Sequence, residues 1–332
     1  MTPYLKPRAS QSGTVIITVL MLIAVATYLA VEMTYRQRID ITRTGTLLAL
    51  SQSEENVKSA EALAQYVLVE DFLADIKKTP STDDLEEQWT TPVQTALGQG
   101  VIEGEITDLQ GRFNINRLLL AGDSVVQFVK LLGNLHIPID SSSSLTPASI
   151  AARVVDWLDE NHDLETDGHE DQEYLLLDPA YTAADRILVD LSELMLIAGI
   201  TREDLERLAP HVALLPPSTK LNVNTATDET LKAYCLDANT IGPIQASGGY
   251  DKESDLDDIV DPGKGSLISN CTPVPARDDL SLETDFFLLK AKATIDKRSI
   301  NMHSVLYRSG STASNVKVKV ILRKHLDPFS GV

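Results

Sequence analysis

The sequence predicts an α+β fold in which a long N-terminal helix packs on a small antiparallel sheet. A large, mainly helical domain is inserted into that sheet. Three observations support this architecture. No proline occurs between Pro7 and Pro80, segments near both ends of the remaining chain alternate as β-strands do, and the middle carries repeated helix-start signals.

The N-terminal segment contains an apolar run long enough to cross a membrane. There is no charged side chain from Ala9 to Val31, and residues 14–31 are almost entirely apolar. As a helix this run covers about 27 Å, close to the hydrocarbon thickness of a bilayer. Lys6 and Arg8 precede the run, which predicts that this end stays in the cytoplasm.

A cleaved secretory signal peptide is the alternative interpretation of the apolar run. It would require a small-residue cleavage site after the apolar core, but the chain continues as Glu32-Met33-Thr34-Tyr35-Arg36. Apolar residues then recur at helical spacings of three and four, at Val57, Ala60, Leu63 or Ala64, and Val67. We therefore expect one helix over residues 14–78, with a length of about 97 Å.

The next segments predict a linker and then strands. Residues 79–99 are polar and are expected to form a linker with one short helix. Residues 101–118 contain two short alternating segments around Gln110-Gly111, which is typical of a hairpin. Three further strands are expected at residues 286–296, 298–309 and 315–324, the last with Val316, Val318, Val320 and Leu322 on one face.

The middle of the chain, roughly residues 117–282, is expected to be mostly helical. Thr146-Pro147 combines a capping residue with a proline at the first helical position. Ser192, Thr201 and Thr227 are each followed by acidic residues, which predicts three more helix starts. This segment lies between the predicted strands and therefore forms an insertion.

The charge of the chain argues against nucleic-acid binding. The formal net charge is −19, whereas affinity for nucleic acid comes from Lys and Arg that neutralise phosphates. LIAGITREDLERL followed by LNVNTATDETL is similar to helix-hairpin-helix modules, but acidic residues outnumber basic ones from Asp190 to Lys232. A phosphate-binding face should be basic, so we expect a helical scaffold without a nucleic-acid partner.

An acidic segment in the middle of the chain is a candidate cation site. Ca²⁺ prefers several carboxylate and carbonyl oxygens from a flexible loop. The carboxylates are Asp156, Asp159, Glu160, Asp163, Glu165, Asp167, Glu170 and Asp171. Counted from Asp159 their spacing partly matches an EF-hand loop, but Leu164 stands where that loop needs glycine. From the residues alone, a calcium site and a solvated acidic loop both remain open.

The other candidate sites point away from catalysis. A second acidic cluster, Asp255, Asp257, Asp258 and Asp261, is expected to be an exposed loop. The sequence contains no G-x-S-x-G, Walker A, H-E-x-x-H or C-x-x-C motif, so we do not expect an enzyme. Cys235 and Cys271 are the only cysteines. They would be reduced thiols inside the cell, but in an exported chain a disulfide is expected.

The N-terminus resembles that of type IV pilins and pseudopilins, with a short basic leader, Gly13, an apolar segment and an amphipathic continuation. The rest resembles the minor pseudopilin K family of type II secretion systems. The matching segments are DLQGRFNINRL, VVDWLDENHDLETDGHEDQEYL, DLSELMLIAGI, LNVNTATDETL and FFLLKAKATID with RSINMHSVLYR. The resemblance implies a pseudopilin fold, and it implies that a prepilin peptidase cuts between Gly13 and Thr14.

Two residues depart from the pilin pattern. Thr14 stands where the family usually has Phe or Met, and Thr18 stands where most members have Glu. In a subunit with no neighbour above it, that glutamate would remain unpaired in the apolar core, which is costly. Its absence fits a subunit at the tip of the filament.

The resemblance also implies a function. A K subunit caps the pseudopilus tip with the I and J minor pseudopilins, contacts other pseudopilus subunits, and lies in the bacterial inner membrane with its soluble domain in the periplasm. The alternatives are a minor pilin of a type IV pilus and, less favoured, a calcium-dependent periplasmic enzyme. The implied metal is Ca²⁺ in the inserted domain, with the ligands Asp159, Asp163, Asp167, Glu170 and Asp171.

The predicted domains follow from the pattern and the resemblance together. They are a leader (1–13), a transmembrane segment (14–31), the rest of the pilin helix with the linker and first hairpin (32–116), the inserted α-domain (117–282) and the C-terminal strands (283–326).

Overall fold

The computed structural model describes residues 12–77, 81–98, 100–120, 122–139, 144–161, 163–296 and 298–326. Most of the predicted leader, residues 1–11, lies outside these described residues.

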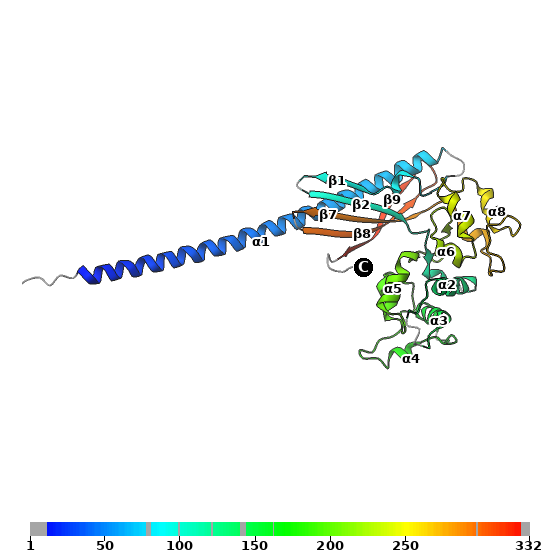
Figure 1. The fold of residues 1–332 in the computed structure, drawn as a ribbon, viewed down its shortest axis with the longest axis horizontal. Coiled ribbons are helices and arrows are strands. Elements are labelled where there is room, and N and C mark those ends of the chain that lie inside the picture. Colours follow the sequence, from blue (N-terminus) through cyan, green and yellow to red (C-terminus); the bar gives the residue numbers. More distant parts are fainter. Residues whose placement is uncertain are drawn as a thin grey trace, which may run out of the picture.

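The N-terminal helix α1 spans Ser12–Asp75 and confirms the expected long helix. Its first half extends away from the rest of the molecule, and its second half packs on the sheet (Figure 1). Val57, Ala60, Ala64 and Leu68 are the buried apolar side chains of this second half. They recur at spacings of three and four, so one face of the helix covers the sheet.

The main sheet has five strands in the order β1-β2-β7-β8-β9, and every neighbouring pair is antiparallel. The strands are β1 (Val93–Leu97), β2 (Gly100–Asp108), β7 (Phe286–Ile295), β8 (Arg298–Ser309) and β9 (Lys317–Leu326). The core between α1 and the sheet includes Ile106, Phe287 and Leu289. Trp89, from the 3₁₀ helix η1 (Gln88–Thr90), packs edge-on against Phe287.

Two strand expectations were wrong. β2 does not form a hairpin across Gln110-Gly111, because β3 (Phe113–Asn114) pairs in parallel with β4 (Val212–Ala213) inside the inserted domain. The hairpin partner of β2 is β1, which lies in the segment expected to be a linker. Every residue of β1 is exposed, so no alternation of buried and exposed positions marks this strand in the sequence.

The last strand also departs from strict alternation. A register shift between Val305 and Leu306 places Val320 opposite Leu306 and Leu322 opposite Val305. Val320 therefore packs against the core under α1, while Leu322 lies on the outer face of the sheet. This β-bulge separates residues that the sequence pattern placed on one face.

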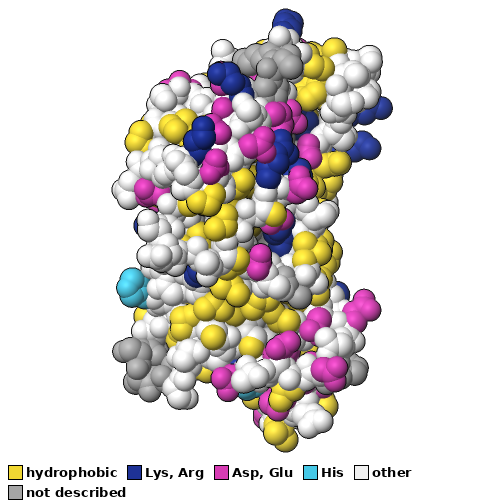
Figure 2. All heavy atoms as spheres, turned by 90° about the vertical axis from the view of Figure 1, so that its right-hand side faces the viewer, with side chains coloured by type: hydrophobic (Ala, Val, Ile, Leu, Met, Phe, Trp, Pro, Cys, Tyr) yellow, Lys and Arg dark blue, Asp and Glu magenta, His cyan; other side chains and the backbone are white. Residues whose placement is uncertain are grey.

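The inserted domain, here called the α-domain, lies at the end of the sheet away from the free end of α1 (Figure 1). Its α-helices are α2 (Asp123–Asn134), α3 (Pro147–Leu158), α4 (Asp171–Tyr174), α5 (Arg202–Leu208), α6 (Asp228–Ala233), α7 (Ala238–Gln245) and α8 (Glu253–Val260). Its shorter elements are the 3₁₀ helices η2 (Ile115–Leu120), η3 (Leu191–Leu196), η4 (Ala209–His211) and η5 (Arg277–Asp279), and the paired strands β5 (Leu221–Asn222) and β6 (Leu280–Ser281). Figure 2 shows the α-domain end of the molecule, where hydrophobic side chains gather in a band between charged regions.

The α-domain has its own hydrophobic core, drawn from residues 113–282. Three of its helix starts were predicted: the side chains of Thr146, Thr201 and Thr227 each accept a hydrogen bond from the helix they precede. The start expected at Ser192 is a 3₁₀ helix capped by Asp190. The boundaries at 116 and 283 remain predictions; the core itself already includes Phe113 and Ile115.

Candidate functional site

The N-terminal half of α1 has the properties of a membrane anchor. It is the one helix among the described residues that is apolar and long enough to span a membrane, with a mean hydropathy of 2.5 over its most apolar stretch and no residue of that stretch buried. The hydroxyls of Thr18 and Thr27 donate to the carbonyls of Val15 and Ile23. Because these polar groups are satisfied within the helix, they do not oppose insertion into lipid.

The predicted cleavage site lies at the start of α1, which begins at Ser12, just before Gly13 and Thr14. Residues 1–11 lie outside the described chain, and nothing in the described part tests recognition by a peptidase. Cleavage between Gly13 and Thr14 therefore stays a prediction.

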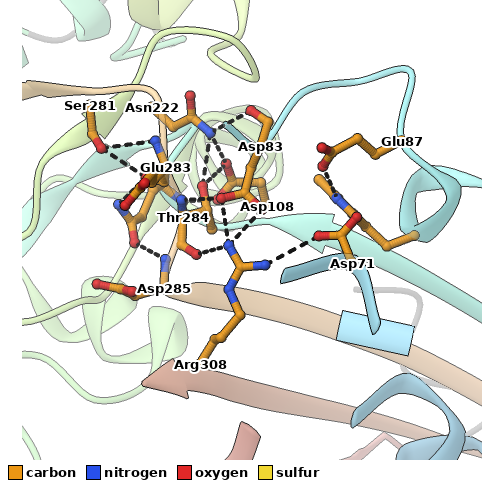
Figure 3. Close-up of polar contacts among 12 residues, drawn as sticks. Asp71, Asp83, Glu87, Asp108, Asn222, Ser281, Glu283, Thr284, Asp285 and Arg308 are labelled. Carbon is orange, nitrogen blue, oxygen red and sulfur yellow. Dashed lines mark hydrogen bonds and ion pairs between the residues drawn. The ribbon is translucent and has the colours of Figure 1, made fainter. Parts of the chain in front are cut away.

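The end of α1, the sheet and the α-domain meet at a buried polar network, here called the junction (Figure 3). At its centre the guanidinium of Arg308 donates to Asp83 at 2.6 Å, to Asp71 at 3.2 Å and to the carbonyl of Thr284 at 2.7 Å. The same guanidinium lies over the ring of Phe287, 4.9 Å from its centre. Arg308 thus joins strand β8 to both α1 and the linker that follows α1.

A second group of hydrogen bonds carries the junction into the α-domain. The carboxylate of Asp108, at the end of β2, accepts from the backbone N–H of Gln110, the side-chain amide of Asn222 and the hydroxyls of Thr225 and Thr284. The amide of Asn222 also donates to the carbonyl of Asp83 at 3.1 Å. One buried asparagine therefore links the α-domain to the sheet and to the linker.

The charges of the junction shift each other's pKa. Burial raises the pKa of Asp71 to about 7, and the charge of Asp83 adds to this effect, although Arg308 opposes it. Burial also raises the pKa of Asp108 to about 6. Burial lowers the pKa of Arg308, but Asp83 and Asp71 outweigh it and raise that pKa overall. Arg308 therefore stays charged while its carboxylate neighbours hold protons more readily than exposed ones do.

The two Asn-x-Asn segments of the sequence explain part of this architecture. In FNIN, the side-chain amide of Asn114 makes hydrogen bonds with the backbone of Leu215 and Pro216. The amide of Asn116 makes hydrogen bonds with the backbone of Leu188 and Leu215. In LNVN, the side-chain amide of Asn224 donates a hydrogen bond to the backbone carbonyl of Tyr250 and accepts one from its N–H. Asn222, the other asparagine of this segment, belongs to the junction. These side-chain amides make hydrogen bonds with backbone groups of buried, irregular segments, which would otherwise need a neighbouring strand.

The five predicted calcium ligands lie in or near the loop between α3 and α4, but they do not converge tightly. Asp163 and Asp167 are exposed, Asp159 and Asp171 are half-buried, and Glu170 is buried. The side chain of Asp171 accepts from the backbone N–H of Ala183. Among the described residues, the one group whose ligand oxygens lie within 4.8 Å of one another is elsewhere.

Asp156, in the last turn of α3 just before this loop, is a buried carboxylate that the ligand prediction omitted. It is fully buried, and its Oδ1 accepts from the backbone N–H of Glu165 at 3.2 Å. Its Oδ2 has no hydrogen-bond partner among the described residues and lies so close to Gly168 that a Cβ there would be 1.9 Å away. Burial raises the pKa of Asp156 to about 6, and burial with the charges of Glu165 and Asp185 raises that of Asp159.

The remaining acidic clusters have different roles. Asp71, Asp75 and Glu87 form the compact carboxylate group, beside the junction. Burial, followed by the neighbouring carboxylates, raises the pKa of Glu87 to about 9, so it keeps its proton at neutral pH. The second cluster predicted from sequence falls on and after helix α8, not in a loop. There Asp257 pairs with Arg277 at the surface.

The two cysteines are joined. Cys235 and Cys271 form a disulfide that ties the segment after α6 to the loop after α8. The neighbouring Leu236 and Leu267 form an isolated antiparallel bridge. The disulfide thus closes a loop of the α-domain that contains helices α7 and α8.

The comparisons with known proteins agree with this architecture. A family model described as type II secretion system protein K matches residues 111–217. Type II secretion system protein K of Pseudomonas aeruginosa is 36% identical over 235 residues, which covers 68% of each chain. The protein of the same name from Aeromonas hydrophila is 32% identical, over 68% of this chain and 70% of that one.

A solved structure shows the same fold. It is titled the crystal structure of the GspK-GspI-GspJ complex from the type 2 secretion system of enterotoxigenic Escherichia coli. The match has a TM-score of 0.71 at 24% identity and covers 86% of this chain and 99% of that one. Every relative named here is a protein of type II secretion, so the type IV pilus alternative is not favoured. The chain belongs to the type II secretion system protein K family and is a minor pseudopilin.

Proposed function

We propose that this minor pseudopilin caps the tip of the pseudopilus together with the I and J subunits and so supports export of folded proteins. The observation that carries the proposal is the likeness, over nearly the whole matched chain, to a structure whose title names a K, I and J complex. The α-domain supports it further, because it adds bulk at the end of the sheet remote from the anchor, where a further subunit would have to stack.

The anchor and the leader define the setting of this role. The apolar half of α1 holds the chain in the inner membrane, with the sheet and α-domain in the periplasm. Prepilin peptidase removes residues 1–13, after which α1 leaves the bilayer sideways and packs among other pseudopilus subunits. The exposed apolar surface of α1 supplies the packing area for this step.

The role is structural and not catalytic. The buried polar residues around Arg308, together with Asn222, make bonds that hold the α-domain to the sheet, and Asn116 makes bonds within the α-domain. The hydrogen bonds of these polar groups therefore serve the architecture.

Calcium binding at the loop between α3 and α4 completes the proposal. The buried Oδ2 of Asp156 without a partner, and the raised pKa values of Asp156 and Asp159, are what a cation would relieve. Asp156 would join the five predicted ligands as an oxygen donor, which suits Ca²⁺. Bound calcium would supply positive charge that converts repulsion among the carboxylates into attraction.

The tip-capping proposal is tested by deletion and complementation in the native bacterium. Loss of exoprotein secretion on deletion, restored by the full chain, is expected, together with co-purification of the I and J subunits with the tagged chain. Normal secretion with loss of pilus-dependent motility would contradict the proposal. So would failure to recover either subunit from membranes that still contain both.

The calcium proposal has its own test. Chelation should lower the melting temperature of the full chain, and added Ca²⁺ should restore it; a ligand at one hundred times its Kd stabilises by about 2.7 kcal/mol. Asp156→Asn should remove this response, while the matched variant Asp257→Asn, in an exposed ion pair, should retain it. A melting temperature that changes with neither chelator nor calcium would show that the loop is only solvated and binds no calcium.

A further inference from the structure

A groove of about 570 Å³ lies between the outer face of the sheet and the α-domain. Its floor is formed by strands β7, β8 and β9, and its wall by η3 and α5. Figure 1 shows α5 beside the sheet. The apolar lining includes Leu288, Val305, Leu322, Leu191, Met195 and Leu205. Met195 and Leu322 keep 46% and 40% of their surface exposed, so these apolar side chains remain available for contact.

The charged groups around the groove are mostly paired with each other. Lys324 pairs with Asp190 at 2.9 Å, which joins strand β9 to the α-domain across the groove. Arg202 pairs with Glu206 at 2.9 Å on one turn of α5. These cations already have carboxylate partners.

Arg112, which also lines the groove, is different. It is half-buried, and its hydrogen bond is a long one of 3.5 Å to the hydroxyl of Thr107. No carboxylate lies within 4.0 Å of its guanidinium among the residues that the structure describes. The planar guanidinium of Arg112 has five N–H donors, and the long bond to Thr107 is the side-chain hydrogen bond that it makes among the described residues. Guanidinium groups normally bind carboxylates, so most of its donor capacity remains available.

The groove is positive, although the chain as a whole carries a net charge of −19. His303, on the floor of the groove, has a pKa lowered by burial and then by the charges of Lys290, Lys324 and Arg112. The lining itself carries more cations than carboxylates: Arg112, Arg202, Lys290 and Lys324 against Asp190 and Glu206.

We propose that this groove binds an extended apolar segment of a partner protein through a carboxylate that pairs with Arg112. The apolar floor would hold the side chains, and the fork of Arg112 would hold the carboxylate through two parallel hydrogen bonds. A peptide fits better than a fatty acid, because paired charges on both rims can exchange bonds with a backbone and with further acidic side chains. This inference does not depend on tip-capping and concerns a face of the sheet that α1 leaves uncovered.

The test uses the full chain in lipid nanodiscs and labelled eight-residue peptides, with binding followed by fluorescence anisotropy. A capped peptide that repeats valine, glutamate and leucine should bind, and its glutamine counterpart should bind about tenfold more weakly or worse. Arg112→Gln should weaken the glutamate peptide by about tenfold or more and erase the difference between the two peptides. The control Arg277→Gln, which alters a paired surface cation that does not line the groove, should change binding by less than about threefold.

Three results would overturn the proposal. These are equal binding of the two peptides, unchanged binding in Arg112→Gln, and binding of dodecanoate without binding of the glutamate peptide, which would identify a lipid site. If circular dichroism shows that Arg112→Gln does not fold, binding is measured instead with Leu322→Glu, since that exposed position tolerates a polar side chain. A carboxylate on the groove floor should abolish binding, and intact binding would show that the peptide lies elsewhere.

Discussion

Replacing Arg308 by glutamine should be among the most destabilising single changes in the part of the chain that the structure describes. Its side chain is 5% exposed and makes ionic contacts with Asp83 and Asp71, both of which are also largely buried. Without the guanidinium the two carboxylates remain buried with their shared cation removed. Breaking a buried pair in this way costs about 3–5 kcal/mol.

The matched control is Arg323→Gln. Arg323 lies on the adjacent strand β9 and pairs with Glu61 of α1 at 2.9 Å, but half of its side chain is exposed to solvent. Screening by solvent on the Arg323 side weakens this pair, although Glu61 is only 6% exposed, so its loss should cost less than that of the Arg308 pairs. Both arginines thus join the same helix to neighbouring strands, and they differ mainly in burial.

Urea unfolding of the full chain in nanodiscs measures the two losses. In a Trp157→Phe background the fluorescence comes from Trp89, which packs on Phe287, the ring that Arg308 covers. Trp89 therefore reports on the junction side of the molecule. The free energy of unfolding follows from the midpoint and slope of the transition.

The result that would refute this reasoning is a loss in Arg308→Gln no larger than that in Arg323→Gln. A second comparison tests the cause. If the cost comes from the stranded carboxylate, then adding Asp83→Asn to Arg308→Gln should cost less than the sum of the single changes, because the two residues interact directly. Strict additivity would place the cost elsewhere.

Three further outcomes are expected. Because the folded pKa of Asp71 is raised to about 7, its proton is held more tightly in the folded state, so stability should fall as pH rises from about 4 to 7, and Asp71→Asn should flatten this slope in urea titrations. Reduction of the Cys235–Cys271 bond should lower stability by up to about 4 kcal/mol in the chain-entropy model, and free-thiol titration of the unreduced, unfolded chain should read near zero. Mass spectrometry of the protein from its native membrane should find a chain that begins at Thr14, whereas a start beyond Val31 would indicate a cleaved signal peptide.

The sequence predicts the elements whose pattern is local. Helix α1 and strands β7 and β8 carry long periodic signals, so both their type and their approximate bounds are correct. β1 was missed because neither of its faces is buried. The pairing of β3 with β4 joins residues about one hundred positions apart through two residues on each side, which no local pattern can indicate.

The junction was not predicted for the same physical reason. Arg308 and Asp83 are separated by 225 positions, and Asn222 and Asp108 by 114. The sequence alone does not distinguish a buried arginine on a strand from an exposed one, because its partners are distant in the chain. The repeated Asn-x-Asn segments were the available signal, because asparagine is mostly exposed, and two pairs between apolar residues indicate buried side chains that bond backbone.

The junction also bears on how a bulky domain could limit filament growth. A domain on a flexible linker would move aside and leave room for a further subunit, whereas a fixed domain would not. Rotation of the α-domain would break the bonds of Asn222 to Asp83, Asp108 and Thr284 together, because one amide serves all three. Each buried polar group left without a partner costs about 1–3 kcal/mol, so even a small rotation is unfavourable. Asp83 and Thr284 also accept hydrogen bonds from Arg308, which bonds Asp71 near the end of α1. The orientation of the α-domain is therefore tied to the helix that would pack in the filament.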